Sequence, residues 1–358
     1  MSITIKEIAR LANVSRATVD KVIHDRPGVK KETRERILTI LNELNYEPNL
    51  IGKALVRSGS TYKIGIILSS EYSTFIQYTL KGLRMAEKEF APFGIEVIVK
   101  TLTSFEPAEL VSILNELQNL KVAGIGLLPI DDEQVKAKLN QLAKDGIPIV
   151  TFNSHLENID QLCFVEQNHY RGGWIAAGLM EKLLPPKGEI GVIISTQSLS
   201  CHPKRLAGFR DRVGQSKKEL KILAIKENFD RKEDAFRLTL DYCHEYPTMQ
   251  GIYISGGGVP GVANALALEG REQNTALICH DLYPETEELL KKDVVDFILD
   301  QDSTAQAYQV IKILFDKIVR KRNPGVAFFD IPLHIITKDF LLDFSDEVNY
   351  GSCMPAME

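Results

Sequence analysis

Residues 4–56, TIKEIARLANVSRATVDKVIHDRPGVKKETRERILTILNELNYEPNLIGKALV, decide the fold of the N-terminal part of the chain. Thr4 stands three residues before Glu7, which is the spacing of a capping box at the start of a helix. Asn13 favours a turn after that helix. The stretch therefore opens with one short helix, because apolar residues recur at helical spacing between the cap and the turn.

Two further amphipathic helices follow this turn. Ser15 is a favourable N-cap for a helix over residues 16–23, and a third helix is expected over about residues 31–44. Two short helices joined by a turn, with a third packed across them, form the helix-turn-helix arrangement. The expected core residues are Ile5, Ile8, Ala9, Ala12, Val19, Val22, Ile23, Ile37, Leu38, Leu41 and Leu44.

The second helix of such a unit enters the major groove, where its N-terminal side chains meet base edges. Arg16 and Lys21 are suited to donate to guanine, and the Ala17 methyl group suits a thymine methyl group. Asp20 has two alternative roles, an ion pair with Arg16 or acceptance from a cytosine amino group, and both stay open. The hydroxyl groups expected at phosphates belong to Thr4, Ser15, Thr18, Thr33 and Tyr46.

The charge of the chain is unevenly distributed. Residues 1–57 contain 11 Lys and Arg against 7 Asp and Glu, a formal charge of +4, whereas the whole chain carries −5. The remaining residues therefore carry −9. A small basic segment on an acidic body agrees with a polyanion-binding module attached to a second domain.

Residues 4–56 resemble the DNA-binding head and hinge of the lactose-repressor (LacI/GalR) family. The resemblance implies that residues 48–57 form the hinge helix of that family, with Asn49 as its N-cap. It also implies that Leu55 is the leucine that family members wedge into the minor groove, where apolar wedges bend the duplex. The family usually has Ser in place of Asp20 and Ala in place of Gly52.

The rest of the chain alternates between strand and helix patterns of the doubly wound α/β kind. Continuous apolar runs predict buried parallel strands over 63–70, 95–101, 122–129, 147–152, 189–195, 222–227, 251–255, 275–281 and 294–300. Amphipathic patterns predict helices over 75–90, 107–119, 133–144, 170–184, 203–215, 232–245, 262–269, 284–292 and 303–321. Two groups of strands indicate two sheets, and hence two lobes.

This body also resembles the sugar-binding periplasmic proteins, which the LacI/GalR family uses as its regulatory core. The resemblance implies that the chain crosses three times between the lobes. We therefore expect a small all-α helix-turn-helix head and an α/β body of two doubly wound parallel-sheet lobes. The expected divisions are a DNA-binding domain over 1–47, a hinge helix and linker over 48–62, an effector-binding and dimerisation domain over 63–345, and a tail over 346–358. Within the body, lobe one would comprise about 63–162 and 300–324, and lobe two about 163–299 and 325–345.

Loops after the expected strands supply candidate effector contacts, because ligands of such folds bind beyond the carboxyl ends of the strands. Tyr72 and Phe75 would stack on a sugar face, since aromatic walls with a few polar groups suit a polyol. The resemblance implies that Arg205 grips sugar hydroxyl groups and that Gln167 and Asn168 stand at a usual Asp-Asn position. The other candidates are Asn153, Ser200, His202, Gly257, Asp281 and Gln301.

A second functional class stays open because of one glycine-rich loop. Gly256, Gly258 and Gly261 follow a predicted strand and precede a predicted helix, and Asp281 stands twenty residues after Gly261. This spacing matches a dinucleotide-binding fingerprint, so an NAD-dependent oxidoreductase is the alternative. Pro260 within the loop and the late position of the loop in the chain argue against it.

Several classes are excluded by composition. The five cysteines show no CxxC spacing and the seven histidines no HExxH pattern, so neither a metal site nor a disulfide framework is expected. No apolar run is long enough for a membrane span, and the N-terminus does not have the pattern of a secretory signal. We expect a cytoplasmic, homodimeric transcriptional repressor without cofactor or enzymatic activity. It would bind a pseudo-palindromic operator under the control of a sugar or polyol effector.

Overall fold

The computed structural model describes residues 5–23, 26–43, 61–69, 74–104, 106–197 and 199–342. The chain divides into two compact units, Met1–Ser58 and Gly59–Glu358. We call the described parts of these units the head and the body, and each is described by itself.

The head consists of α1 (Ile5–Leu11), α2 (Arg16–Ile23) and α3 (Lys31–Glu43). Asn13 adopts the left-handed conformation, with φ of 50°, in the turn between the first two helices. Leu38 is 44% exposed, so its predicted place in the core is wrong. Successive helical residues point about 100° apart, and Ile37 already takes the inward direction. The buried core residues are Ile8, Ala9, Ala12, Val19, Val22 and Ile37, whereas Leu44 lies outside the described residues.

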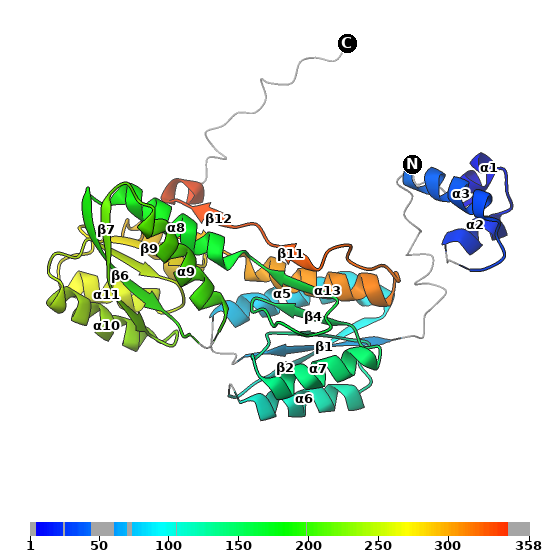
Figure 1. The fold of residues 1–358 in the computed structure, drawn as a ribbon, viewed down its shortest axis with the longest axis horizontal. Helices are drawn as coiled ribbons and strands as arrows, with labels where there is room; N and C mark the ends of the chain where they lie inside the picture. The colour runs from blue at the N-terminus through cyan, green and yellow to red at the C-terminus, as the bar shows by residue number, and fades with distance from the viewer. Residues whose placement is uncertain are drawn as a thin grey trace, which may run out of the picture. The chain divides into compact units, whose positions relative to one another are not determined.

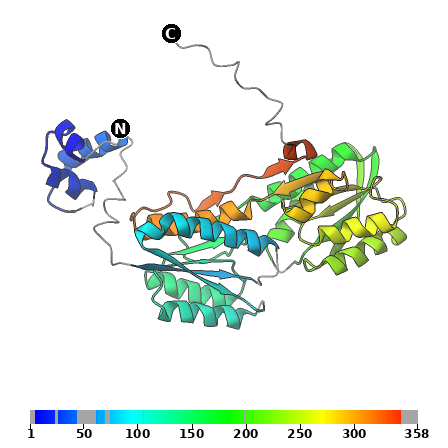
Figure 2. The same cartoon turned by 180° about the vertical axis from the view of Figure 1, so that it is seen from behind.

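The first sheet of the body contains six parallel strands in the order β11-β5-β4-β3-β1-β2. Their bounds are β1 Tyr62–Leu68, β2 Ile95–Thr101, β3 Gly124–Leu127, β4 Ile149–Phe152, β5 Cys163–Glu166 and β11 Phe328–Asp330. Two helices, α5 (Thr74–Phe90) and α13 (Ser303–Ile318), pack on one face, side by side in Figure 2. On the other face lie α6 (Pro107–Asn119) and α7 (Glu133–Lys144), and η1 (Ala91–Phe93) follows α5.

The second sheet has the order β12-β10-β9-β8-β6-β7, in which only β12 runs antiparallel to its neighbour. Its strands are β6 Lys187–Ile194, β7 Glu219–Glu227, β8 Gly251–Ile254, β9 Ala276–His280, β10 Phe297–Asp300 and β12 His334–Ile336. One face packs on α8 (His169–Leu183) and α9 (Cys201–Gly214). The other packs on α10 (Lys232–Glu245), α11 (Val259–Leu268) and α12 (Pro284–Lys291), with η2 (Lys338–Leu341) near the end (Figure 1).

All nine expected strands of the body are present, and three short ones are additional. Because β5 pairs with β4, residues 163–166 belong to the first sheet and not to lobe two as expected. Residues 328–330 likewise pair with β5 in the first sheet, so they do not belong to the expected second part of lobe two, about 325–345. Strands of three or four residues carry too little periodicity to be recognised, and distant partners decide their sheet. The chain passes between the sheets after β5, after β10 and after β11.

The carboxyl ends of the parallel strands gather unusual backbone conformations. Asn153, Asp281 and Asp302 follow β4, β9 and β10 with φ of 60°, 71° and 47°. Phe229 and Asp230 follow β7 with φ of 52° and 57°. These φ values lie in the left-handed backbone region, where residues other than glycine are strained. Strain of this kind concentrates at functional sites. The strand ends are therefore where the site of the body is to be sought.

Candidate functional site

The helix α2 of the head presents the side chains expected at base edges. Arg16, Ala17 and Lys21 are exposed on it. Ser15 caps the helix, because its Oγ accepts a hydrogen bond from the Thr18 N–H at 3.1 Å and lies 2.8 Å from the Thr18 Oγ1. Ser15 remains exposed, so its hydroxyl group can cap the helix and still face a phosphate.

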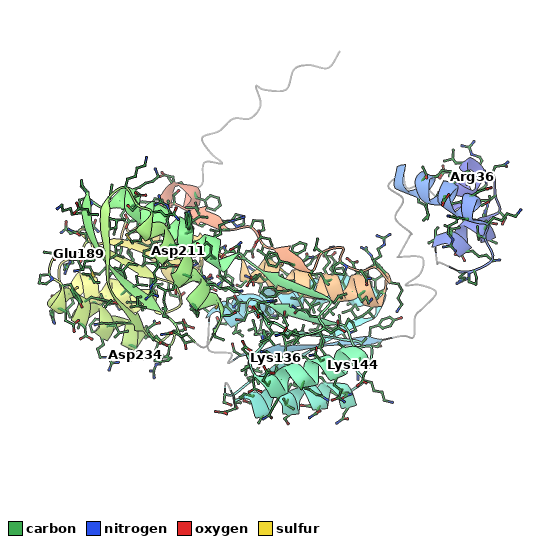
Figure 3. All side chains as sticks on the ribbon, viewed as in Figure 1. Arg36, Lys136, Lys144, Glu189, Asp211 and Asp234 are labelled. Atoms are coloured by element: carbon green, nitrogen blue, oxygen red, sulfur yellow. The ribbon has the colours of Figure 1, made fainter. Side chains whose placement is uncertain are left out.

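Asp20 forms an ion pair with Arg26, in which Oδ2 and Nη1 lie 3.4 Å apart. The sequence offered Arg16 as the partner, and the structure adds Arg26 from the loop after α2. Thr33 is half-buried on α3, where Arg36 projects outward (Figure 3). Of the remaining candidates, Thr4, Tyr46, Asn49 and Leu55 in the N-terminal segment and Tyr72 in the body lie outside the described residues.

In the body, the two lobes contact each other at the carboxyl ends of their strands. The carbonyl oxygen of Asn153 lies 2.8 Å from Nε2 of His169, and the carboxylate of Glu166 lies 3.5 Å from the ammonium group of Lys204. At another point, the rings of Tyr78 and Tyr283 are 4.8 Å apart. Residues of the first lobe thus meet α8, α9 and the start of α12 in the second.

Arg205 on α9 is the central side chain of this contact region. It is only 2% exposed, and its Nη1 donates to the Ser255 carbonyl at 2.6 Å. Its Nε and Nη2 have no hydrogen-bond partner among the residues that the structure describes. A buried guanidinium group with free donors is costly unless a ligand pairs with it. The geometry therefore suits Arg205 to bind polar ligand atoms.

Two close helix contacts hold Arg205 in this place. A Cβ atom on Gly173 of α8 would overlap the backbone carbonyl of Arg205, and one on Gly208 of α9 would overlap that of Tyr170. Glycine at both positions lets the helix backbones approach closely. The main chain of Arg205 is thus fixed against α8 before its side chain reaches the contact region.

Asp281 and Gln301 lie together on the second lobe's strand ends. The Gln301 side-chain amide donates to the Asp281 carboxylate at 2.8 Å, and Gln306 donates to the Gln301 carbonyl at 3.0 Å. Burial raises the pKa of Asp281 to about 6, although the positive charge of Arg205 acts to lower it. Desolvation of the Asp281 carboxyl group therefore outweighs the attraction of the Arg205 charge.

Three charged or titratable residues that the sequence did not single out join this region. Burial raises the pKa of Glu166 to about 7 and lowers the pKa values of His169 and His280 well below the ordinary range. Both imidazole rings are therefore neutral, and each has an unpartnered Nδ1. The signal that could have identified His280 is its position as the last residue of β9, whereas Glu166 ends a strand that the sequence did not reveal.

The other effector candidates take part in core packing, helix capping or hydrogen bonds within the protein. Phe75 is half-buried and packs on the core of the first lobe. Asn168 caps α8, because its side-chain oxygen accepts from the Arg171 N–H at 2.9 Å. Gln167 is buried and donates weakly to the Asp300 carbonyl at 3.5 Å, and Nδ1 of His202 lies 3.3 Å from the Ser255 hydroxyl. The hydroxyl of Ser200 accepts from the His155 N–H of the first lobe at 3.3 Å.

The glycine-rich loop after β8 packs against the loop after β7. The Gly257 N–H donates to the Asp230 carboxylate at 2.7 Å, and the Asn228 amide donates to the Gly257 carbonyl at 2.7 Å. A Cβ atom on Gly258, where φ is 92°, would come close to the Asn228 amide. A carboxylate thus lies where a dinucleotide fingerprint would place a phosphate, and the loop glycines are explained by loop packing.

Two further observations concern the described residues alone. No group of three or more His, Cys, Asp and Glu side chains within them is arranged to hold a metal ion. None of their helices has the length and apolarity needed to span a bilayer.

Comparisons with known proteins agree with this division into head and body. The model of a periplasmic binding protein domain matches residues 64–322, and that of bacterial regulatory proteins of the lacI family matches residues 4–49. Catabolite control protein A of Priestia megaterium is 29% identical over 221 residues, 60% of this chain and 62% of that protein. The ribose operon repressor of Haemophilus influenzae is 29% identical over 216 residues, 60% of this chain and 61% of that protein.

Among solved structures, the glucose-galactose binding protein GanP of Geobacillus stearothermophilus superposes with a TM-score of 0.71 at 21% identity. The superposition covers 79% of this chain and 99% of that one. This likeness shows the fold of the body, whereas the chain matches just over three-fifths of the curated relatives' length. Since one family model covers the body and the other the head, the chain combines a head of the lacI family of bacterial regulatory proteins with a body that belongs to the periplasmic binding protein domain family.

Proposed function

We propose that this protein is a sequence-specific transcriptional repressor whose affinity for operator DNA is set by a sugar or polyol bound between the two lobes. One observation carries the proposal: a head with an exposed, Ser15-capped helix is joined to a body whose lobes enclose Arg205 with two free donors. The names of the relatives, a catabolite control protein and a ribose operon repressor, support the same function.

The proposed signal passes from the body to the head. The ligand joins the strand ends of both lobes and so favours the closed arrangement, which changes the spacing of the two hinges in a homodimer. The hinge helices expected over residues 48–57 then form or melt at the operator centre. Two heads would occupy the half-sites of a pseudo-palindromic operator in the cytoplasm.

The alternative of an NAD-dependent oxidoreductase receives no support. None of the relatives named above is an oxidoreductase by name. The Asp230 carboxylate already accepts from the Gly257 N–H, and its negative charge opposes a pyrophosphate there. We therefore propose no cofactor and no enzymatic reaction for this chain.

The experiment begins with the purified full-length protein and fragments of the genome that encodes it. At low ionic strength we expect it to enrich particular fragments over random duplex DNA, with an affinity that falls as salt increases. A protein that cannot distinguish any fragment from random duplex would refute the proposal.

The coupling between the two sites is tested separately. Ligands found by thermal shift are titrated with and without the enriched DNA, and the change in ligand affinity should equal the change in DNA affinity caused by the ligand. Equal ligand affinity in both titrations would refute the coupling and leave DNA binding intact.

A further inference from the structure

Among the polar atoms left unpaired at the carboxyl ends of the strands, hydrogen-bond acceptors outnumber donors, while the unpaired Nδ1 atoms of His155 and His280 and the hydroxyl of Tyr283 can do either. Five buried acceptors have no hydrogen-bond partner among the described residues, although the Glu166 oxygen lies 3.5 Å from Nε2 of His169: Asn153 Oδ1, Glu166 Oε2, Gln167 Oε1, His169 Nδ1 and Asn228 Oδ1. We call these five residues together with Arg205 and Asp281 the interlobe cluster. Against the five acceptors stand the two free donor atoms of Arg205. An unpaired buried polar atom is unfavourable, so a ligand is expected to supply the missing partners.

The assignment of acceptors rests on fixed partners at two positions. Nε2 of His169 lies 2.8 Å from the Asn153 carbonyl oxygen, which can only accept, so Nε2 carries the proton and Nδ1 is an acceptor. The Asn228 amide nitrogen donates to the Gly257 carbonyl at 2.7 Å, which leaves Oδ1 as the free end of that side chain. These partners fix which nitrogen of the His169 ring carries the proton, and they exclude the flipped orientation of the Asn228 amide.

The charges of the cluster point in the same direction. Lys204 is already paired with Glu166 at 3.5 Å, and Arg205 is the cation that acts on Glu166, His169, His280 and Asp281 together. Asp230 and Asp300 add negative charge close to Asp281. Asp281 thus has more negative than positive neighbours, and a further negative charge beside it would be repelled.

We propose that the effector is an uncharged polyhydroxylated molecule, and that the cluster rejects its anionic counterparts such as uronates and sugar phosphates. This inference rests on the proposed function and deepens it. A hydroxyl group can donate to one of the five acceptors while it accepts from Arg205, so a neutral polyol satisfies both sets of atoms. A ligand carboxylate or phosphate supplies acceptors where the protein already has an excess.

The test uses pairs of ligands that differ only in charge, titrated calorimetrically into the full-length protein. The neutral set comprises aldopentoses, aldohexoses, hexitols and inositols, and each hit is compared with its uronate and its phosphate. We expect at least one neutral polyol to bind. The affinity for its anionic counterparts should be lower by about 100-fold or by a larger factor. A uronate or phosphate that binds as tightly as its neutral counterpart, or no binding across the whole neutral set, would overturn the proposal.

A variant series links the discrimination to the cluster. Asp281→Asn should lower the affinity for the neutral ligand. It should also reduce the ratio of the affinities for the neutral ligand and the uronate, because it removes a negative charge beside the ligand. Asp211→Asn is the matched control, since that carboxylate projects outward from α9 and accepts from the Tyr170 hydroxyl (Figure 3). An unchanged ratio in Asp281→Asn would overturn the electrostatic explanation. Failure of operator binding in the wild-type protein would count against the proposed function, while these ligand titrations would remain decisive.

Discussion

Gly173 of α8 lies directly against the backbone carbonyl of Arg205 on α9, so closely that a Cβ atom on Gly173 would overlap it. This contact joins a position without a side chain to the side chain best suited to bind the effector. The glycine therefore positions Arg205, and its replacement should alter the site without removing any polar group.

Gly173→Ala should displace α9 from α8 and lower the free energy of unfolding by about 1–3 kcal/mol, the usual cost of overpacking. We expect the shift to misplace Arg205 and weaken effector binding at least tenfold. Denaturant unfolding and ligand titration measure the two effects. Gly178→Ala on the same helix is the control, because its Cβ would lie an ordinary 3.8 Å from the Arg212 Nε. Equal behaviour of the two variants would show that the close contact is unimportant.

Arg205→Ala should abolish the response to effector and spare operator binding, because it removes the two unpaired donors and leaves the head unchanged. Arg205→Lys should recover little, since an ammonium group cannot reproduce the planar set of donors. Operator binding with and without ligand is the measurement. Loss of operator binding in a well-folded Arg205→Ala protein would place Arg205 in the transmission of the signal and not at the ligand.

Arg16→Ala and Lys21→Ala should each weaken operator binding by roughly 1–3 kcal/mol and relax the base preference at one position of each half-site. Arg36→Ala removes the same charge from an exposed position on α3 and serves as the control. Binding to a library of half-site variants distinguishes the cases. Uniform weakening on all sequences would mean that Arg16 and Lys21 contact only phosphates.

Glu166→Gln should change how stability depends on pH. Burial raises the pKa of Glu166 from 4.5 to about 7, so between these values the folded state holds a proton that the unfolded state has lost. The free energy of unfolding of the wild type therefore falls as pH rises through this interval. Relative to wild type, we expect the free energy of unfolding of Glu166→Gln to increase by roughly 3 kcal/mol between pH 4.5 and pH 8.

Glu181 provides a control of opposite sign. Its carboxylate accepts from the Ser216 hydroxyl at 2.7 Å and the Lys217 N–H at 2.9 Å, and these bonds lower its pKa to about 2. Its contribution to stability is present above pH 4.5 and disappears as pH falls toward 2. Glu181→Gln should thus lose stability near neutral pH and match the wild type in strong acid. Parallel pH profiles for the two variants would contradict both assignments.

The head could be predicted well because its signals are local. The N-cap at Ser15, the turn at Asn13 and the apolar spacing all lie within a few residues of the helix that they define. Leu38 shows the limit of this approach, since a leucine beside Ile37 satisfies the pattern but faces solvent. The pair of Asp20 with Arg26 was missed because a loop, and not the helix, supplies the partner.

In the body, long apolar runs were sufficient for nine strands, whereas β5, β11 and β12 were missed. Each is short, and pairing across many residues holds it in place, as between β11 and β5. Arg205, Asp281 and Gln301 were predicted as effector contacts from their positions near strand ends and from the family resemblance, and this role stays a prediction. Glu166 and His169 were not, because an acidic residue and a histidine in a loop-like stretch give no sign that both will be buried.

The sequence by itself determined the elements of this protein and the family to which it belongs, because helix caps, apolar periodicity and the head motif depend on near neighbours. Only the tertiary structure decided which sheet the short strands join and which polar atoms remain unpaired between the lobes. The pKa values of Glu166 and Asp281 belong to this second group. They depend on burial and on distant charges such as Arg205, which no local pattern records.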